Sequence, residues 1–176
     1  MARCVVIAGS AGLDPRQRGA GLAGTGPHRA RRGPRGVAAR HDLDLNRHLA
    51  GPLEKHGGRD PLPAPTIFAG RLARFGVGPQ SEVVAYDDSR LAFAARLWWL
   101  LRALGYRAPR LLNGGYRAFL SAGGVPETEI PVPQSIAPLP VAGFTGYCDI
   151  DGLREIQAHG ARLIDSREAR RYAGLE

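Results

Sequence analysis

Lysine, cysteine and long apolar runs are nearly absent from this chain of 176 residues. Lys55 is the single lysine among 24 basic residues. Cys4 and Cys148 are too few for a disulfide framework, and neither has metal-ligand neighbours at zinc-finger spacing. No stretch reaches the roughly 18 apolar residues that a membrane span needs, and no secretory pattern precedes the first apolar residues. We therefore expect a cytoplasmic protein that makes no membrane contact.

Acidic residues are scarce at one end of the chain only. Residues 1–40 hold eight arginines and one acid, Asp14, whereas residues 41–176 hold sixteen basic and fifteen acidic residues. The excess of positive charge therefore lies almost entirely in the first forty residues. A basic arm can bind nucleic acid through its phosphates. The composition is more typical of a disordered segment without a partner, and we predict no nucleic-acid partner.

The first forty residues otherwise show one short element. Residues 1–12 predict a strand followed by a glycine turn, but no amphipathic helix follows, as a dinucleotide site would require, so we predict no cofactor. Residues 13–40 consist mainly of Arg, Gly, Ala and Pro and lack hydrophobic periodicity. They cannot bury enough surface to offset the entropy lost on ordering. We expect residues 1–37 to be a disordered arm.

Residues 41–76 predict a strand end, a long loop and a helix. Potential metal ligands occur in the loop region, but their spacing matches no ligand pattern, and we predict no metal site; they are Asp42, Asp44, His48 and His56. Residues 66–76 predict an amphipathic helix that begins at a Thr66 cap and ends at Gly76. Four large apolar residues share one face of this helix: Ile67, Phe68, Leu72 and Phe75.

The most informative stretch is 83–120, which predicts a strand–helix–strand unit. Residues 83–86 are apolar without alternation, which is typical of a parallel strand covered on both faces. An apolar helix is expected over 91–104, followed by a strand over 110–112, and such units are right-handed. Ligand sites in open α/β sheets lie beyond the carboxyl ends of the strands. That rule singles out residues 87–89 and 113–115.

Asp87 can be interpreted in two ways. The simpler interpretation is that Asp87 and Asp88 cap the following helix and interact favourably with its dipole, with Asp88 or Ser89 as the cap residue. The alternative is an acidic nucleophile, as in phosphoaspartyl enzymes. That chemistry needs further carboxylates for Mg²⁺ and a lysine on later strands, and none is visible. We favour the capping role.

The last fifty residues fall into two segments of different composition. Residues 127–147 are rich in proline and predict an extended linker. Residues 148–176 then predict a short helix over 151–160 and a strand over 161–167. One helix and one strand cannot fold alone, so we interpret 148–176 as the start of a second domain that this chain does not complete.

The motifs along 38–176 resemble those of tandem rhodanese sulfurtransferases, which act on thiosulfate or 3-mercaptopyruvate. The resemblance rests on segments in the family's order: Asp42-Leu43-Asp44, Pro61-Leu62-Pro63, 83–88, 94–102, 105–106, 111–115 and 163–172. It implies an α/β fold with an open parallel sheet and helices on both faces, in which the first strand is poorly represented. It also implies a non-catalytic domain over 38–126.

The resemblance implies a mechanism as well as a fold. In this family a cysteine in a loop of inward-pointing N–H groups becomes a thiolate. The thiolate takes sulfane sulfur from the donor as a persulfide and passes it to cyanide or a thiol. In the first of the two domains an aspartate fills that place, and here it is Asp87. We therefore expect this chain, which ends before the family's cysteine loop, to be catalytically silent alone.

The resemblance assigns two further residues and leaves two questions open. Arg167 and Asp44 stand where the family has donor-binding or cleft-facing groups, and the implied partners are small sulfur-donor anions. Asp60 stands where the family often has a histidine. The family's opening strand motifs are not found in 1–40, which suggests either a reading-frame error or a non-homologous start for 1–37. The alternative function is a non-catalytic rhodanese-like module that binds a partner.

Overall fold

The computed structural model describes residues 3–9, 39–55, 58–123, 132 and 134–175, and of 3–9 and 39–40 the backbone alone. The chain divides into two compact units, Met1–Thr145 and Gly146–Glu176. The predicted arm lies mostly outside the described residues. The first unit carries the sheet and its helices, and each unit is considered by itself.

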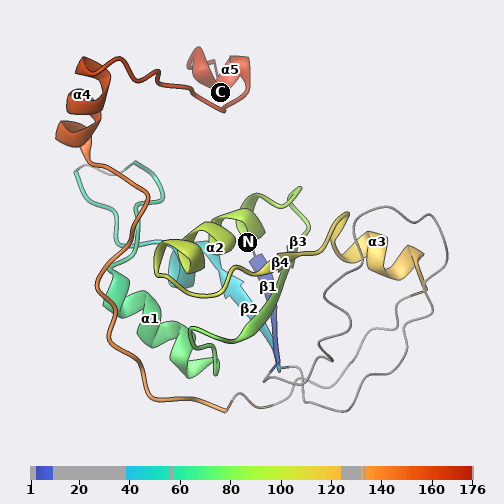
Figure 1. Cartoon of the computed structure of the whole chain (residues 1–176). Helices are drawn as coiled ribbons and strands as arrows, with labels where there is room; N and C mark the ends of the chain where they lie inside the picture. The colour runs from blue at the N-terminus through green and yellow to red at the C-terminus, as the bar shows by residue number, and fades with distance from the viewer. Residues whose placement is uncertain (1–2, 10–38, 56–57, 124–131, 133, 176) are drawn as a thin grey trace. The chain divides into compact units, whose positions relative to one another are not determined.

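The first unit is built on a four-stranded sheet in the order β2-β1-β3-β4 (Figure 1). Its strands are β1 (Arg3–Gly9), β2 (Ala39–Asp44), β3 (Glu82–Asp87) and β4 (Arg110–Leu111). β3 and β4 are parallel, whereas β1 lies between β2 and β3 and is antiparallel to both. Cys4 of β1 is the backbone partner of both Leu43 and Asp87. β2 and β3 therefore end at the same edge of the sheet.

These strands confirm the strands predicted over 1–12, 83–88 and 110–112. The sheet is not entirely parallel, because β1 runs against its two neighbours. The strand–helix–strand unit itself is as expected: β3, then α2 (Ala92–Ala103), then β4 parallel to β3. The fold is α/β, and its parallel pair carries the edge at which a ligand site is expected.

The helix α1 (Pro65–Arg74) corrects two details of the prediction. Thr66 is not the cap, since Pro65 already occupies the first turn, where its missing N–H costs nothing. Ile67 is 55% exposed and does not join the buried face. Phe68 and Leu72 are buried as predicted, and Gly76, at φ 73°, ends the helix in the left-handed conformation that glycine favours.

One hydrophobic core joins β3 to α1 and α2. Val83 and Ala85 point to the same face of β3 and are almost completely buried. The helical side chains of this core come from α1 and α2 together with the π-helical turn η2 (Leu45–Leu49); they are Leu49, Phe68, Leu72, Ala94, Leu97, Leu100 and Leu101. Tyr86 alternates to the opposite face, where it stacks on Tyr116 of α3 (Gly115–Ser121) at 5.9 Å between ring centroids. Helices therefore contact both faces of β3.

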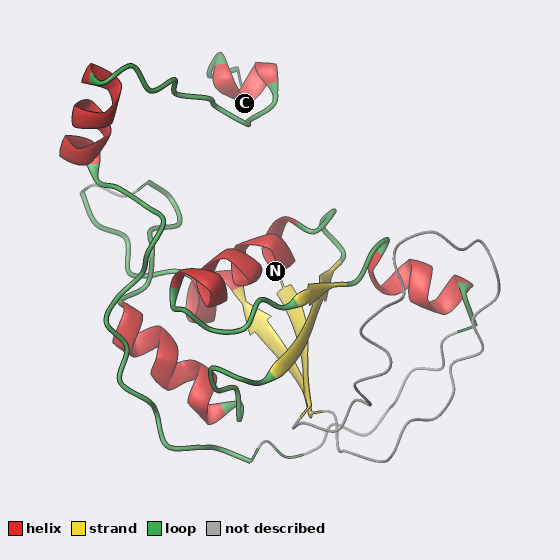
Figure 2. Cartoon of the chain, viewed as in Figure 1, coloured by secondary structure: helices red, strands yellow, loops and turns green. Residues whose placement is uncertain are grey.

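The described part of the proline-rich segment up to Thr145 belongs to the first unit and has no regular structure (Figure 2). The Ile136 N–H donates to the Ala73 carbonyl at 2.9 Å, and the Thr145 N–H donates to the Ala103 carbonyl at 2.9 Å. The Phe144 ring packs between α1 and α2, near Phe68 and Trp99. This segment thereby ties the ends of both helices together.

The second unit contains α4 (Ile150–Ala158) and α5 (Ala169–Tyr172). Asp149 caps α4, accepting the Gly152 N–H at 2.8 Å. The strand predicted over 161–167 is wrong, because these residues are irregular. A strand needs a neighbouring strand for its ladder, and the described unit offers none. No helix among the described residues is long and apolar enough to cross a membrane.

Candidate functional site

Asp87 is the last residue of β3, and its side chain is only 5% exposed. Its carboxylate accepts four backbone hydrogen bonds from the residues that follow. One oxygen accepts the N–H groups of Ser89 at 2.7 Å and Leu91 at 2.9 Å. The other accepts those of Phe93 at 2.9 Å and Ala94 at 2.8 Å. A buried carboxylate without a cationic partner is costly, and these four donors satisfy it.

The loop between β3 and α2 curls around this carboxylate because two residues adopt left-handed conformations. Arg90 has φ 55° and Leu91 has φ 67°. Each such non-glycine conformation costs on the order of 1–3 kcal/mol, and it persists only where the surroundings enforce it. Here the four hydrogen bonds to Asp87 enforce it. The loop therefore forms a ring of inward-pointing N–H groups around one anionic position.

The capping interpretation of Asp87 is confirmed, but the cap residue named for it was wrong. Neither Asp88 nor Ser89 is the cap residue of α2, since the N-cap position is Leu91, whose own side chain forms no capping hydrogen bond. Asp87 reaches the first-turn N–H groups of Phe93 and Ala94 from the strand end instead. The Asp88 side chain is exposed.

The turn before α3 fixes Asp87 from the opposite side. Gly114 and Gly115 have φ values of 75° and 62°. A Cβ on Gly115 would lie 2.8 Å from the Asp87 carbonyl oxygen. Only glycine allows the backbone to pass this close in that conformation. Both strand ends singled out by the sequence therefore meet at Asp87.

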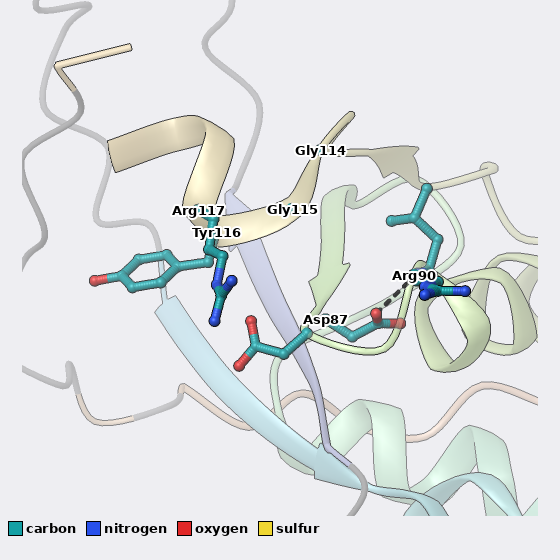
Figure 3. A pocket seen from close by; sticks show the side chains of 8 residues that line it. Asp87, Arg90, Gly114, Gly115, Tyr116 and Arg117 are labelled. Atoms are coloured by element: carbon teal, nitrogen blue, oxygen red, sulfur yellow. Dashed lines mark hydrogen bonds between the residues drawn. The ribbon is translucent and has the colours of Figure 1, made fainter. Parts of the chain in front are cut away.

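A pocket of about 610 Å³ opens at this edge (Figure 3). It is lined by the end of β3, the loop that follows it, and the turn and first residues of α3: Asp87, Asp88, Arg90, Leu91, Gly114, Gly115, Tyr116 and Arg117. The site lies where the strand ends predicted it. Ser89 and Asn113, which belonged to the predicted stretches, do not line the pocket.

Asp44 lies at the same edge of the sheet as Asp87, on the far side of β1. Its carboxylate caps η2 and accepts the Arg47 N–H at 2.9 Å. This hydrogen bond, with a smaller contribution from the one to Asn46, lowers the pKa of Asp44. Asp44 does not line the pocket.

Arg167 belongs to the second unit and is paired with Asp165. Its guanidinium donates to both carboxylate oxygens, with Nε at 2.9 Å and Nη2 at 2.6 Å from Oδ2. The hydrogen bonds to Arg167 lower the pKa of Asp165, and those to Asp165 raise the pKa of Arg167. To bind an external anion with its full fork, Arg167 would have to release Asp165.

Three residues near the site were missed by the sequence reasoning. Arg90, Tyr116 and Arg117 line the pocket, and their only signal was that they follow the two singled-out strand ends. A fourth residue, Arg96, is a charged residue within the apolar helix α2. It donates to the carbonyl oxygens of Leu49, Asp60 and Pro61 at 3.0 Å each, and burial lowers its pKa.

No metal centre can be built from the side chains that the structure describes. In that part of the chain no group of three or more His, Cys, Asp or Glu side chains is arranged to hold a metal ion. The chemistry of the site is therefore that of one buried, fully hydrogen-bonded carboxylate beside a pocket with two arginines.

Comparison with known proteins places this site in a family. Residues 46–122, which include β3, α2, β4 and α3, match the model of the rhodanese-like domain. A probable 3-mercaptopyruvate sulfurtransferase of Pseudomonas aeruginosa is 37% identical over 147 residues, covering 78% of this chain and 50% of the relative. A putative thiosulfate sulfurtransferase of Mycobacterium tuberculosis is 35% identical over 119 residues, covering 66% of this chain and 42% of the relative.

A mammalian relative is also similar over part of its length. The thiosulfate sulfurtransferase of Cricetulus griseus is 32% identical over 120 residues, covering 65% of this chain and 40% of the relative. The chain thus spans half or less of the length of these curated relatives. No solved structure matches significantly. The chain contains a rhodanese-like domain and is similar in sequence to thiosulfate and 3-mercaptopyruvate sulfurtransferases.

Proposed function

We propose that residues 38–126 are the non-catalytic rhodanese-like domain of a sulfurtransferase. In the complete reaction, sulfane sulfur passes from thiosulfate or 3-mercaptopyruvate to cyanide or a thiol through a cysteine persulfide. The observation that carries this proposal is the Asp87 carboxylate, which fills the ring of N–H groups at the end of β3.

An aspartate at this position cannot carry the sulfur. Persulfide formation needs a thiolate that attacks the donor's sulfane sulfur, forms an S–S bond and expels sulfite or pyruvate. A carboxylate oxygen forms no comparable bond to sulfur. Both oxygens of Asp87 are also occupied by backbone donors, which would otherwise stabilise a thiolate or persulfide.

The roles of the remaining segments extend the same proposal. Residues 148–176 are the start of a second rhodanese-like domain, joined by the segment 127–147, and the division of the chain after Thr145 supports this assignment. Arg167 and Asp44 contribute to donor binding in the complete enzyme, which acts in the cytoplasm. The apolar side chains left exposed in the second unit, such as Leu163 at 67% and Ile164 at 84%, support a need for further packing partners.

The proposal is tested by thiocyanate formation from cyanide with thiosulfate or 3-mercaptopyruvate as donor. The purified chain of 176 residues is expected to show no turnover above the uncatalysed rate. The variant Cys148→Ser is the matched control, because Cys148 is an exposed free thiol that could react without any domain. Robust turnover that survives this substitution would refute the proposal.

The alternative function, a rhodanese-like module that binds a ligand without sulfur transfer, is favoured by one observation. The pocket beside Asp87 carries two arginines that the sulfur-transfer chemistry does not use.

A further inference from the structure

Two cationic side chains at the pocket have no ion-pair partner among the residues that the structure describes. Arg90 and Arg117 are both exposed, and in the described part of the chain neither forms an ion pair or a side-chain hydrogen bond. Other arginines near the sheet are engaged: Arg107 pairs with Glu82 at 2.8 Å, and Arg96 donates to three carbonyl groups. The pocket therefore presents two guanidinium forks that are available to a ligand.

The two guanidinium groups come from different segments of the chain and lie on different sides of Asp87. Arg90 belongs to the loop that wraps Asp87, and Arg117 belongs to α3. Figure 3 shows Arg117 reaching from α3 toward the end of β3, with Arg90 on the other side of Asp87. Because the two guanidinium groups lie on different sides of Asp87 in this view, we expect a compact inorganic ion to contact one of them at a time. An elongated molecule with an anionic group at each end could meet both.

The backbone of both loops is held in place, so the forks project from fixed positions. Asp87 fixes the Arg90 loop through four hydrogen bonds. Gly115 is packed against the Asp87 carbonyl group, and Tyr116 is stacked between Tyr86 and Phe119 at 5.9 and 6.2 Å. A backbone that is ordered before binding lowers the entropy cost of binding.

The pocket has two acidic residues, and only one of them has a carboxylate that is free to repel an anionic ligand. Asp87 directs both its oxygens to backbone N–H groups. Asp88 is exposed and lines the pocket, so its carboxylate repels an anion. Two guanidinium groups and one uncommitted carboxylate leave the ligand-facing wall positive.

We propose that this pocket binds an elongated small organic diacid, with one carboxylate on Arg90 and the other on Arg117. Its volume, about 610 Å³, falls within the roughly 300–1,000 Å³ typical of sites for small organic ligands. Arginine forks bind carboxylates through paired hydrogen bonds. Tyr116 is half-buried and also lines the pocket, so that it offers apolar atoms to the carbon chain of the ligand.

This inference deepens the proposed function, because it gives the site beside Asp87 a ligand. It rests on the proposed function in one respect, namely that no sulfur transfer takes place at this site. The two can fail separately. Thiocyanate turnover would refute the silence of the domain and leave diacid binding intact. Absence of diacid binding would leave the silence of the domain intact.

The test is a titration of the purified chain with adipate, followed by the amide resonances of Gly114, Gly115 and Tyr116. Hexanoate, a monoacid of the same length, and sulfate, a compact dianion, are titrated in parallel. Adipate is expected to shift these resonances at lower concentration than either. Equal or weaker binding of adipate would overturn the elongated-diacid assignment.

Four variants locate the interaction. Arg90→Gln and Arg117→Gln are each expected to weaken adipate binding by up to about fivefold, the usual range for one exposed ion pair. Asp88→Asn is expected to tighten binding. Arg74→Gln, at an exposed arginine of α1 outside the pocket, should bind as the unmodified chain does.

The variants also show which result contradicts the proposal. Unchanged adipate affinity in both Arg90→Gln and Arg117→Gln would overturn it, as would an equal loss in Arg74→Gln, which would indicate a general charge effect. Unperturbed amide spectra in the absence of ligand establish that each variant is folded.

Discussion

The Asp87 carboxylate accepts the backbone N–H of Ala94, seven residues further along the chain, at 2.8 Å in a buried position. This hydrogen bond joins the end of β3 directly to the first turn of α2. Asp87, which we propose stands at the place of a nucleophile, thus acts as a structural cap. The stability of the domain and its proposed lack of sulfur transfer therefore depend on the same side chain.

Removal of the Asp87 carboxylate should destabilise the domain strongly. Asp87→Ala leaves four N–H groups without their acceptor, and we expect the free energy of unfolding to fall by at least about 2 kcal/mol. The free energy of unfolding of Asp87→Asn should lie between those of the unmodified chain and of Asp87→Ala, because the amide keeps one accepting oxygen. Urea unfolding followed by circular dichroism measures these differences.

The control for Asp87 is its neighbour Asp88, which is exposed. Asp88→Ala should change the free energy of unfolding by less than about 0.5 kcal/mol. Equal effects at the two positions would show that the hydrogen bonds to Asp87 contribute nothing specific.

A methyl group at Gly115 should separate the two loops of the site. Gly115→Ala places a Cβ 2.8 Å from the Asp87 carbonyl oxygen at φ 62°. Left-handed backbone alone costs an alanine roughly 1–2 kcal/mol, so we expect a loss of about 2 kcal/mol or more in the free energy of unfolding. Thermal and urea unfolding both report this change.

Gly70 provides the matched substitution in the same domain. It lies inside α1, and a Cβ there would meet nothing within 4 Å. Gly70→Ala should stabilise the chain by up to about 1 kcal/mol, since alanine is the better helix former. A stabilising Gly115→Ala would be incompatible with the close approach at Asp87.

Two histidines of the first unit, the buried His41 and the half-buried His48, should make its stability fall in mild acid. Burial lowers the pKa of both His41 and His48 below the ordinary value of 6.5. As the pH falls below about 6.5 the unfolded chain takes up protons first, so stability is complete above that pH and is lost toward the lowered folded-state pKa. The pKa of Asp44 is also lowered, but this changes the stability only at pH values near and below the ordinary value of 3.8, outside the range in which the histidines titrate.

The measurement is the urea midpoint between about pH 7.5 and 5.5. His41 stacks near Phe75 at 4.8 Å between ring centroids, so His41→Phe keeps an aromatic ring while removing one titrating group. The decline of the midpoint with pH should be shallower in this variant. His159→Asn, at an exposed histidine of the second unit, should retain the decline of the unmodified chain, and a pH-independent midpoint would contradict the assignment.

Arg96 should stabilise the domain more than a surface arginine does. Its guanidinium donates to three carbonyl oxygens, those of Leu49, Asp60 and Pro61. Arg96→Gln leaves most of these bonds unmade, and we expect a loss of about 2 kcal/mol in the free energy of unfolding. Arg102→Gln, which removes a cation stacked over Trp98 at 4.5 Å, should cost less than about 1 kcal/mol. Equal losses would contradict this role.

Much of the first unit could be predicted because its signals are local. The unbroken apolar run 83–86 and the apolar stripe of the following helix required only periodicity, and the structure has β3 and α2 there. The carboxyl ends of the predicted strands then indicated a site at Asp87 and at the glycines of the next turn. The arginines of the pocket could not be assigned, because an exposed arginine carries no periodic signal and the chain has many.

Other details depend on tertiary contacts that no local pattern reports. The direction of β1 is set by its pairing with β2 and β3, strands that lie far from it in sequence. Pro65 displaced Thr66 from the cap of α1. The irregular 161–167 segment shows that an apolar run forms no strand without a neighbour.

The central claim is that Asp87 occupies the place of a sulfur-carrying nucleophile, and a cysteine at that position tests it most directly. Cys4 is the backbone partner of Asp87, so Cys4 and Cys148 are first replaced by serine to leave one thiol in Asp87→Cys. After incubation with thiosulfate, the intact mass of this variant should increase by one sulfur atom, and cyanide should reverse the change. The same serine background with Asp87 retained should gain no sulfur. A sulfur adduct on that Asp87 protein, or none on Asp87→Cys when its unfolding shows it to be folded, would contradict the account.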